Sequence, residues 1–291
     1  GTGSIVITPA GRGPDGYYKD TAEADTFEVW ADIARRYPLD PEWTSITGVS
    51  MGGFGTWRLS TRYPDLFARA MPIVAGGREY DDKLISLRNV PVTLWTSVLD
   101  ELQPVVNTEP TVMEMLALGL RIDSRRFETW DHLSPSTNDY YAPGVEFLGE
   151  ARVQRHPAHV SYVMNTAEDF ARSNVVANKA YWLSELVLHD AALQQGSIDV
   201  VSGGQGLAEP AVIPTVQRND LYSGGYLEPT LFTQRLIEWQ PAVPVPVRDT
   251  LVITARNMAR VTIDPLRAKV SCKAAMQIDS DAPLVVTLKG C

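Results

Sequence analysis

A chain of 291 residues, of which 44% are hydrophobic, is long enough to form one large or two ordinary domains with a buried core. The net charge is −9, the acidic excess lies wholly within residues 1–150, and no basic run occurs, so nucleic acid is excluded as an expected partner. Because no run of about eighteen apolar residues is present, we expect no membrane span.

The first half of the chain alternates strand-like and helix-like segments. The β-branched run SIVITP at residues 4–9 predicts a buried strand. Asp20 and Glu23 resemble a capping box at the start of a helix expected over residues 21–37. The further elements expected are strand 44–49, helix 51–63, strand 68–75, strand 91–97, helix 108–119 and strand 126–130. This alternation predicts a parallel α/β sheet.

The pattern changes after residue 149. Strands without clear helices between most of them are expected at 159–165, 180–190, 196–202, 250–255, 260–264 and 283–289. The last of these alternates its residues as a strand with one buried face does. We therefore expect an α/β domain over residues 1–150 and a β-rich, sandwich-like accessory domain over residues 151–291.

Residues 44–60 read TSITGVSMGGFGTWRLS and contain the motif G-x-S-x-G at Gly48, Ser50 and Gly52. A β-branched run precedes the motif and a helical pattern follows it, so we expect the serine at a tight strand-to-helix turn with a strained backbone. Glycine is expected at both flanking positions because a Cβ there would collide with the turn. In this context Ser50 is a candidate nucleophile.

A serine hydroxyl becomes nucleophilic when a base removes its proton, and imidazole is suited to this near neutral pH. His132 follows the expected strand 126–130, on a loop at the carboxyl edge of the sheet, and is the candidate base. The other three histidines lie in the expected second domain: His156, His159 and His189. Two of them, His159 and His189, fall inside strand patterns, where a packed or surface role is expected.

A carboxylate must hold the imidazole in the tautomer that can accept the serine proton. Asp100 follows the expected strand 91–97, and this position favours it as the orienting acid. Glu101 is the nearest competitor. Asp131 is a weaker one because it adjoins His132 in sequence.

The two cysteines, Cys272 and Cys291, both lie in the last 20 residues. We favour a disulfide between them over two buried free thiols, since a cysteine at the end of the chain is otherwise hard to explain. A disulfide favours an oxidising compartment, so a secreted or cell-envelope location is expected. No Cys-x-x-Cys pattern occurs, and we expect no metal and no organic cofactor.

The segment GVSMGGFGTWRLSTRYPDLFARAMPIVAG resembles the nucleophile-elbow region of the α/β-hydrolase superfamily. The resemblance is to the prolyl oligopeptidase-like hydrolases and the related secreted esterases of the feruloyl esterase and polyhydroxyalkanoate depolymerase types. VPVTLWTSVLDELQPV resembles the acid loop of that superfamily, which implies Asp100, and FETWDHLSPSTNDYYAPGVEFLG resembles its histidine loop, which implies His132. The backbone N–H of Met51 is then expected to bind the oxyanion. The resemblance covers residues 4–150.

This resemblance also implies strands that the chain does not supply before residue 4. The chain opens with Gly-Thr-Gly-Ser and has no signal peptide, which indicates a processed or truncated N-terminus. In the superfamily that the chain resembles, a loop after the third strand normally provides the second oxyanion donor, and we find no such loop in this sequence. A separate N-terminal fragment that completes the sheet is therefore an expected partner.

Four aromatic residues lie near the candidate groups in sequence and could line a substrate site: Tyr17, Tyr18, Trp95 and Trp130. No arginine or acidic clamp for a peptide terminus stands out, which favours a small-molecule or polymer ester as the substrate. We thus expect a carboxylesterase-like serine hydrolase. The alternatives are a prolyl oligopeptidase-like peptidase, an inert binding module, and one chain of a processed two-chain protein.

Overall fold

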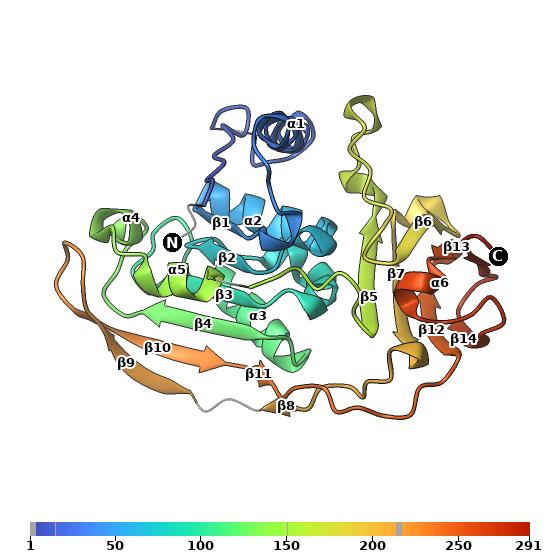
Figure 1. Cartoon of the computed structure of the whole chain (residues 1–291). Coiled ribbons are helices and arrows are strands. Elements are labelled where there is room, and N and C mark those ends of the chain that lie inside the picture. Colours follow the sequence, from blue (N-terminus) through green and yellow to red (C-terminus); the bar gives the residue numbers. More distant parts are fainter. Residues whose placement is uncertain (1–3, 15, 150, 214–216) are drawn as a thin grey trace.

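The computed structural model describes residues 4–14, 16–149, 151–213 and 217–291 (Figure 1). Gly1 to Gly3, where a processed N-terminus was expected, lie outside the described residues. The chain forms an α/β part and a β-rich part, as the sequence predicts. Extended segments connect the two parts, and two of them pair through the short strands β8 (Val212–Ile213) and β11 (Glu238–Trp239).

A six-stranded sheet organises the α/β part, in the order β1-β2-β3-β4-β10-β9. The first four strands are parallel, and the last two form an antiparallel hairpin on the edge of β4. The strands are β1 (Ile46–Val49), β2 (Ala70–Ile73), β3 (Val92–Ser97), β4 (Ile122–Phe127), β9 (Arg218–Tyr222) and β10 (Thr230–Leu236). Parallel strands place their carboxyl ends at one edge of the sheet, which is where binding groups gather in such folds.

Helices cover both faces of this sheet. They are α1 (Thr21–Arg36), α2 (Met51–Arg62), α3 (Val105–Ala117), α4 (Ser134–Asn138), α5 (Ala142–Leu148) and the 3-10 segment η3 (Arg78–Asn89). Successive residues of β3 face opposite sides, as the two-residue period of a strand requires. Leu94 packs with Trp57 and Met115 in one core cluster, and Trp95 packs with Phe127 in the other.

The β-rich part is a sandwich of two sheets, ordered β14-β12-β7-β5 and β15-β13-β6. Its strands are β5 (His159–Asn165), β6 (Leu183–Leu188), β7 (Gln195–Ser202), β12 (Thr250–Arg256), β13 (Met258–Ile263), β14 (Ala275–Ser280) and β15 (Val285–Leu288). Side chains from both sheets share one core, including Val200, Ile253 and Val261. Apolar burial between the sheets stabilises them, by roughly 25 cal/mol for each Å2 of apolar surface removed from water.

Short helical turns complete the described chain. They are α6 (Pro265–Ala268), η1 (Pro41–Trp43), η2 (Pro64–Leu66), η4 (Thr166–Glu168), η5 (Ala171–Ser173), η6 (Ala191–Leu193) and η7 (Gly203–Gln205). None of the helices in the described part of the chain has the length and apolar character that crossing a bilayer requires.

A disulfide links Cys272 to Cys291, as predicted from the sequence, with the two Cα atoms 5.5 Å apart. The bond joins the segment before β14 to the residues after β15. Because β14 pairs with β12 in one sheet and β15 pairs with β13 in the other, the closed loop contributes a strand to each sheet of the sandwich.

Two expectations for the N-terminal region are wrong. Residues 4–9 form no strand, and Ile5 and Val6 are 47% and 85% exposed, because a β-branched run becomes a strand only where a neighbouring strand pairs with it. Asp20 makes no side-chain cap to α1. Glu23 is fully buried and instead receives hydrogen bonds from the α2 arginines.

The β9–β10 hairpin was not expected. It comes from the sequence range assigned to the second domain, yet β10 pairs with β4 over five residues of each strand. The α/β sheet therefore draws on residues from both sides of residue 150. The strand expected at 126–130 begins earlier, at Ile122. Its first half carries polar side chains, and β10 supplies hydrogen-bond partners for them, since Gln234 donates to Asp123.

Candidate active site

Ser50 lies between the end of β1 and the first residue of α2. Its φ of 55° and ψ of −116° place it in a strained region for a residue with a side chain. The turn is held in place because the Ser50 N–H donates to the Ile73 carbonyl of β2 at 2.9 Å. Ser50 thus lies directly after the carboxyl end of β1 and directly before α2, at the strand-to-helix turn that the motif predicts.

The two motif glycines differ in what they require. A Cβ on Gly48 would lie 2.3 Å from the carbonyl of Gly52, so only glycine fits there. The expectation that Gly52 is equally constrained is wrong, since a Cβ on it would meet nothing within 4 Å. Gly53 of α2, outside the motif, is a second tight position, where a Cβ would lie 2.5 Å from the Ala75 Cβ. Close packing of α2 on the sheet therefore depends on Gly48 and Gly53.

His132 follows β4 on a loop at the same edge of the sheet. The loop is anchored by Trp130, whose ring stacks on Phe127 with centroids 4.0 Å apart and meets Tyr222 of β9 edge-on at 5.4 Å. His132 itself is 4% exposed. An aromatic cluster thus fixes the position from which the imidazole reaches the serine.

The structure brings the three predicted polar side chains together. His132 Nε2 lies 2.8 Å from Ser50 Oγ, and Nδ1 lies 2.8 and 2.9 Å from the two carboxylate oxygens of Asp100. A carboxylate only accepts hydrogen bonds, so the proton of a neutral imidazole sits on Nδ1 and leaves Nε2 free to accept from the serine hydroxyl. The geometry is that of a hydroxyl, a base and an orienting acid in series.

Asp100 is held in place by the backbone of its own loop. Its Oδ1 accepts hydrogen bonds from the N–H groups of Leu102 at 2.9 Å and Gln103 at 2.7 Å, and the residue is 3% exposed. These bonds fix the carboxylate without a second charged side chain.

The two competing acids are placed differently. The Glu101 carboxylate accepts from the backbone N–H of His132, at 3.4 Å, and its contact is therefore with the loop and not with the ring. Asp131 accepts from the N–H groups of Leu133 and Ser134 and from the Ser134 hydroxyl. These hydrogen bonds, that of the Ser134 hydroxyl first, lower the pKa of Asp131. Among these three acids, Asp100 is the one that the structure brings to the imidazole.

Met51 is the first residue of α2, so its N–H has no acceptor within the helix. That N–H lies next to Ser50, at the end of the helix where the peptide dipoles favour negative charge. The neighbouring strand β1 is the outer strand of the sheet, and within the described residues no strand pairs with its second edge. A separate fragment that completes the sheet there stays a prediction.

Of the four aromatic residues expected to line a substrate site, two are buried. Trp95 and Trp130, at 1% and 3% exposure, lie inside the aromatic cluster below the histidine loop and not on a substrate surface, because both faces of the sheet need apolar cover. Tyr18 packs its ring against Gly55 of α2, and its hydroxyl donates to the Pro9 carbonyl at 3.3 Å. Tyr17 is exposed and meets Phe54 edge-on at 5.8 Å, one helical turn after Ser50.

The remaining histidines lie in the β-rich part, as expected. His159, on β5, bonds to Asp199 and Glu209. His156 accepts from Arg267 at 3.3 Å, and His189 bonds through its backbone N–H to Asn257. In the part of the chain that the structure describes, no three His, Cys, Asp or Glu side chains are grouped as metal ligands.

Sequence reasoning missed the residue that joins the histidine loop to the hairpin. Asn138, at the end of α4, donates to the Gly224 carbonyl at 3.0 Å and accepts from the Leu227 N–H at 2.9 Å. A Cβ on Gly225 would lie 2.3 Å from the Asn138 carbonyl oxygen. In sequence, the pair Gly224-Gly225 indicates only a loop, since glycine pairs are common in turns.

Comparison with known proteins gives a weak and partial likeness. No protein-family model matches the chain, and no curated protein matches it in sequence. Among solved structures, a thermostable esterase is similar with a TM-score of 0.37 and 22% identity, over 46% of this chain and 37% of the other. Esterase PE8 is similar with a TM-score of 0.34 and 22% identity, over 38% of this chain and 53% of the other. The chain thus spans about a third to a half of the length of these two proteins.

Proposed function

We propose that the protein is a serine hydrolase that cleaves carboxylic esters, with Ser50 as nucleophile, His132 as base and Asp100 as orienting acid. The observation that carries the proposal is the pair of contacts of one imidazole: Nε2 to Ser50 Oγ at 2.8 Å, and Nδ1 to Asp100 at 2.8 Å. The strained backbone at Ser50 supports it further, since such strain persists where function needs it.

In this reaction Ser50 Oγ attacks the ester carbonyl carbon while His132 Nε2 takes the hydroxyl proton. The Met51 N–H donates to the carbonyl oxygen, on which negative charge develops. Collapse of the tetrahedral intermediate breaks the bond to the alcohol, and His132 returns its proton to that leaving oxygen. Water then attacks the acyl-Ser50 ester with His132 again as base, which releases the acid and restores the serine.

An active-site fluorophosphonate tests the nucleophile directly. We expect stoichiometric labelling of Ser50, found by mass spectrometry of peptides, and no labelling of the Ser50→Ala variant. Ser60 is a matched control because it is a buried serine of the same helix whose hydroxyl donates to the Thr56 carbonyl at 2.6 Å, so Ser60→Ala leaves labelling unchanged. A folded wild-type chain that is not labelled would contradict the proposal.

Turnover of p-nitrophenyl esters, compared with turnover of peptide anilides, tests the substrate class. We expect ester hydrolysis that Ser50→Ala abolishes, and slower or no hydrolysis of the anilides. Faster cleavage of the anilides would identify a peptidase. Labelling of Ser50 without turnover of either substrate would retain the nucleophile and overturn the ester assignment.

A further inference from the structure

The β9–β10 hairpin is inserted between two strands of the sandwich. Strands β7 and β12 are antiparallel neighbours there, and a short turn can join such strands. The chain instead forms β8 to β11 between them, and this insertion places the hairpin on the edge of β4 (Figure 1). β4 leads directly into the histidine loop, here residues 128–141 between β4 and α5. The sandwich itself does not require the insertion, so the hairpin is better explained by its contacts with this loop.

The hairpin holds the loop on the side that precedes His132. The Glu128 N–H donates to the Leu231 carbonyl of β10 at 2.9 Å, and the hydroxyl oxygens of Thr129 and Thr230 lie 2.6 Å apart. Thr230 is buried, so water competes little with this hydrogen bond. The first residues of the loop are therefore fixed to β10.

The same hairpin holds the loop on the side that follows His132. The Asn138 amide donates to the Gly224 carbonyl at 3.0 Å and accepts from the Leu227 N–H at 2.9 Å. The backbone carbonyl of Asn138 also accepts from the Tyr226 N–H at 3.0 Å. Asn138 is 1% exposed, and an unmade bond at such a buried amide would be costly. These bonds join the end of α4 and the tip of the hairpin into one unit.

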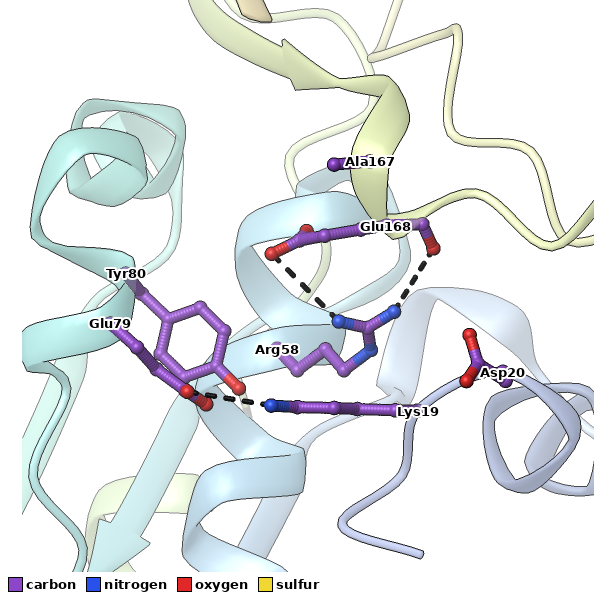
Figure 2. Close-up of a pocket in the computed structure, with 7 residues that line it drawn as sticks. All are labelled: Lys19, Asp20, Arg58, Glu79, Tyr80, Ala167 and Glu168. Carbon is purple, nitrogen blue, oxygen red and sulfur yellow. Dashed lines mark hydrogen bonds and ion pairs between the residues drawn. The ribbon is translucent and has the colours of Figure 1, made fainter. Parts of the chain in front are cut away.

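The serine side of the catalytic contact has a separate anchor. Arg58 of α2 donates to the backbone carbonyl of Glu168 at 3.1 Å and lies 3.8 Å from a carboxylate oxygen of the same residue (Figure 2). Its Nε donates to Glu23 of α1 at 2.7 Å. The helix that begins after Ser50 is thus held by α1 and η4. A change at the hairpin therefore acts on the histidine side of the contact.

We propose that the β9–β10 hairpin holds His132 in contact with Ser50 and Asp100, with Asn138 as the positioning residue. The inference rests on the function proposed above for these three side chains. Their contacts of 2.8 Å require the imidazole to stay in place, because a misplacement of about 1 Å can lower a rate about a hundredfold. The hairpin supplies this restraint because it holds the loop both before and after the histidine.

Turnover of a p-nitrophenyl ester by the full chain tests the proposal. Asn138→Ala removes both side-chain bonds to the hairpin, and we expect kcat to fall about tenfold to a hundredfold with KM unchanged, because the hairpin fixes the base and does not bind the ester. Thr230→Val keeps a branched side chain and removes the bond to Thr129, and we expect a smaller loss. Asn89→Ala is the matched control. Asn89 of η3 is also buried and donates to the His159 carbonyl at 2.9 Å, so this variant loses stability and keeps kcat.

Proton NMR of the His132 Nδ1–H gives a second measurement that does not depend on turnover. This proton lies in the hydrogen bond to Asp100, so it resonates at low field, and its signal is assigned by its loss in His132→Gln. We expect a sharp signal in the wild type and in Asn89→Ala. In Asn138→Ala we expect a signal broadened by faster exchange with water, because the loop is released from the hairpin.

The two measurements separate this proposal from the proposed reaction. A wild-type chain with no labelling of Ser50 and no turnover would overturn the reaction, and the NMR comparison would still decide the role of the hairpin. A sharp Nδ1–H signal and wild-type kcat in Asn138→Ala would overturn that role. If Asn138→Ala does not fold, Thr230→Val decides by the same criteria. An equal loss of kcat in Asn89→Ala would also contradict the proposal, because it would show a general effect of lost stability.

Discussion

Asp100 meets the Nδ1 side of His132 with both carboxylate oxygens, at 2.8 and 2.9 Å. This contact fixes both the orientation of the ring and the nitrogen that carries the proton. Two backbone N–H groups hold the carboxylate from its own loop, so the arrangement does not rely on mobile side chains. The two side chains come from loops that follow β3 and β4, which are adjacent parallel strands.

Asp100→Asn tests the role of this contact. The amide keeps the shape of the side chain but can donate to Nδ1, which favours the tautomer that cannot accept the serine proton. We expect kcat for a p-nitrophenyl ester to fall by about a hundredfold to ten-thousandfold. Glu101→Gln is the control, since Glu101 contacts the backbone N–H and not the ring, and it should change kcat less than about tenfold. Equal losses in the two variants would argue against the assigned roles.

Gly48→Ala and Gly52→Ala test the turn that holds Ser50. At Gly48 the new Cβ would lie 2.3 Å from backbone, so we expect a loss of about 1–3 kcal/mol in the free energy of unfolding. At Gly52 the Cβ meets nothing, and the helical position favours alanine by up to about 1 kcal/mol. Urea unfolding measures both values. The turn would not be the constraint that we describe if the two variants were equally stable.

Local pattern was enough to predict most elements of the chain and the three side chains at the candidate site. G-x-S-x-G with a strand before and a helix after is a local signal, and His132 and Asp100 follow strands that the apolar residues mark. The sequence did not predict elements whose position depends on contacts between residues far apart in the chain. The exposed β9 carries little apolar pattern, and its place on the sheet depends on β10 and on Tyr222 packing against Trp130.

The same reason explains the errors near the N-terminus and at the aromatic residues. Glu23 has the spacing of a capping residue, but Arg58 and Arg62 on α2 take up its carboxylate, a contact that no local pattern shows. Trp95 and Trp130 adjoin the acid and histidine loops in sequence. Their burial follows from the layers on each face of the sheet, which become visible only once the fold is known.

His159 provides a prediction about pH. Burial by itself would lower the pKa of this histidine, but hydrogen bonds to Asp199 and Glu209 outweigh that effect and raise the pKa above its usual value. The same bonds lower the pKa of both carboxyl groups, against the effect of their burial. Arg88 also faces the cluster, as an ion pair with Glu209, and Ser161 donates to Asp199.

The histidine contribution to stability is complete below the unfolded pKa of about 6.5 and is lost as the pH rises through the higher folded pKa. The carboxylate contributions are present above about pH 4 and are lost as the pH falls through the lower folded pKa values. We therefore expect His159→Gln to lower the free energy of unfolding most between about pH 4.5 and 6.5, and less at about pH 8.5. Urea unfolding across this range measures the difference, and a difference independent of pH would show that the cluster does not titrate as described. His189→Gln is the control, because His189 bonds to Asn257 through its backbone N–H, which the substitution keeps.

The disulfide gives the last prediction, because it constrains only the end of the sandwich. Cys272 and Cys291 are 19 residues apart, and closing a loop of this size restricts the unfolded chain by about 3 kcal/mol. We expect the double variant Cys272→Ser, Cys291→Ser to lose up to about 3 kcal/mol of unfolding free energy. Labelling of Ser50 by the fluorophosphonate should continue at the wild-type rate in the folded variant, since the groups around His132 come from the other part of the chain. A loss of labelling while the variant remains folded would show that the sandwich supports the site through contacts beyond those described.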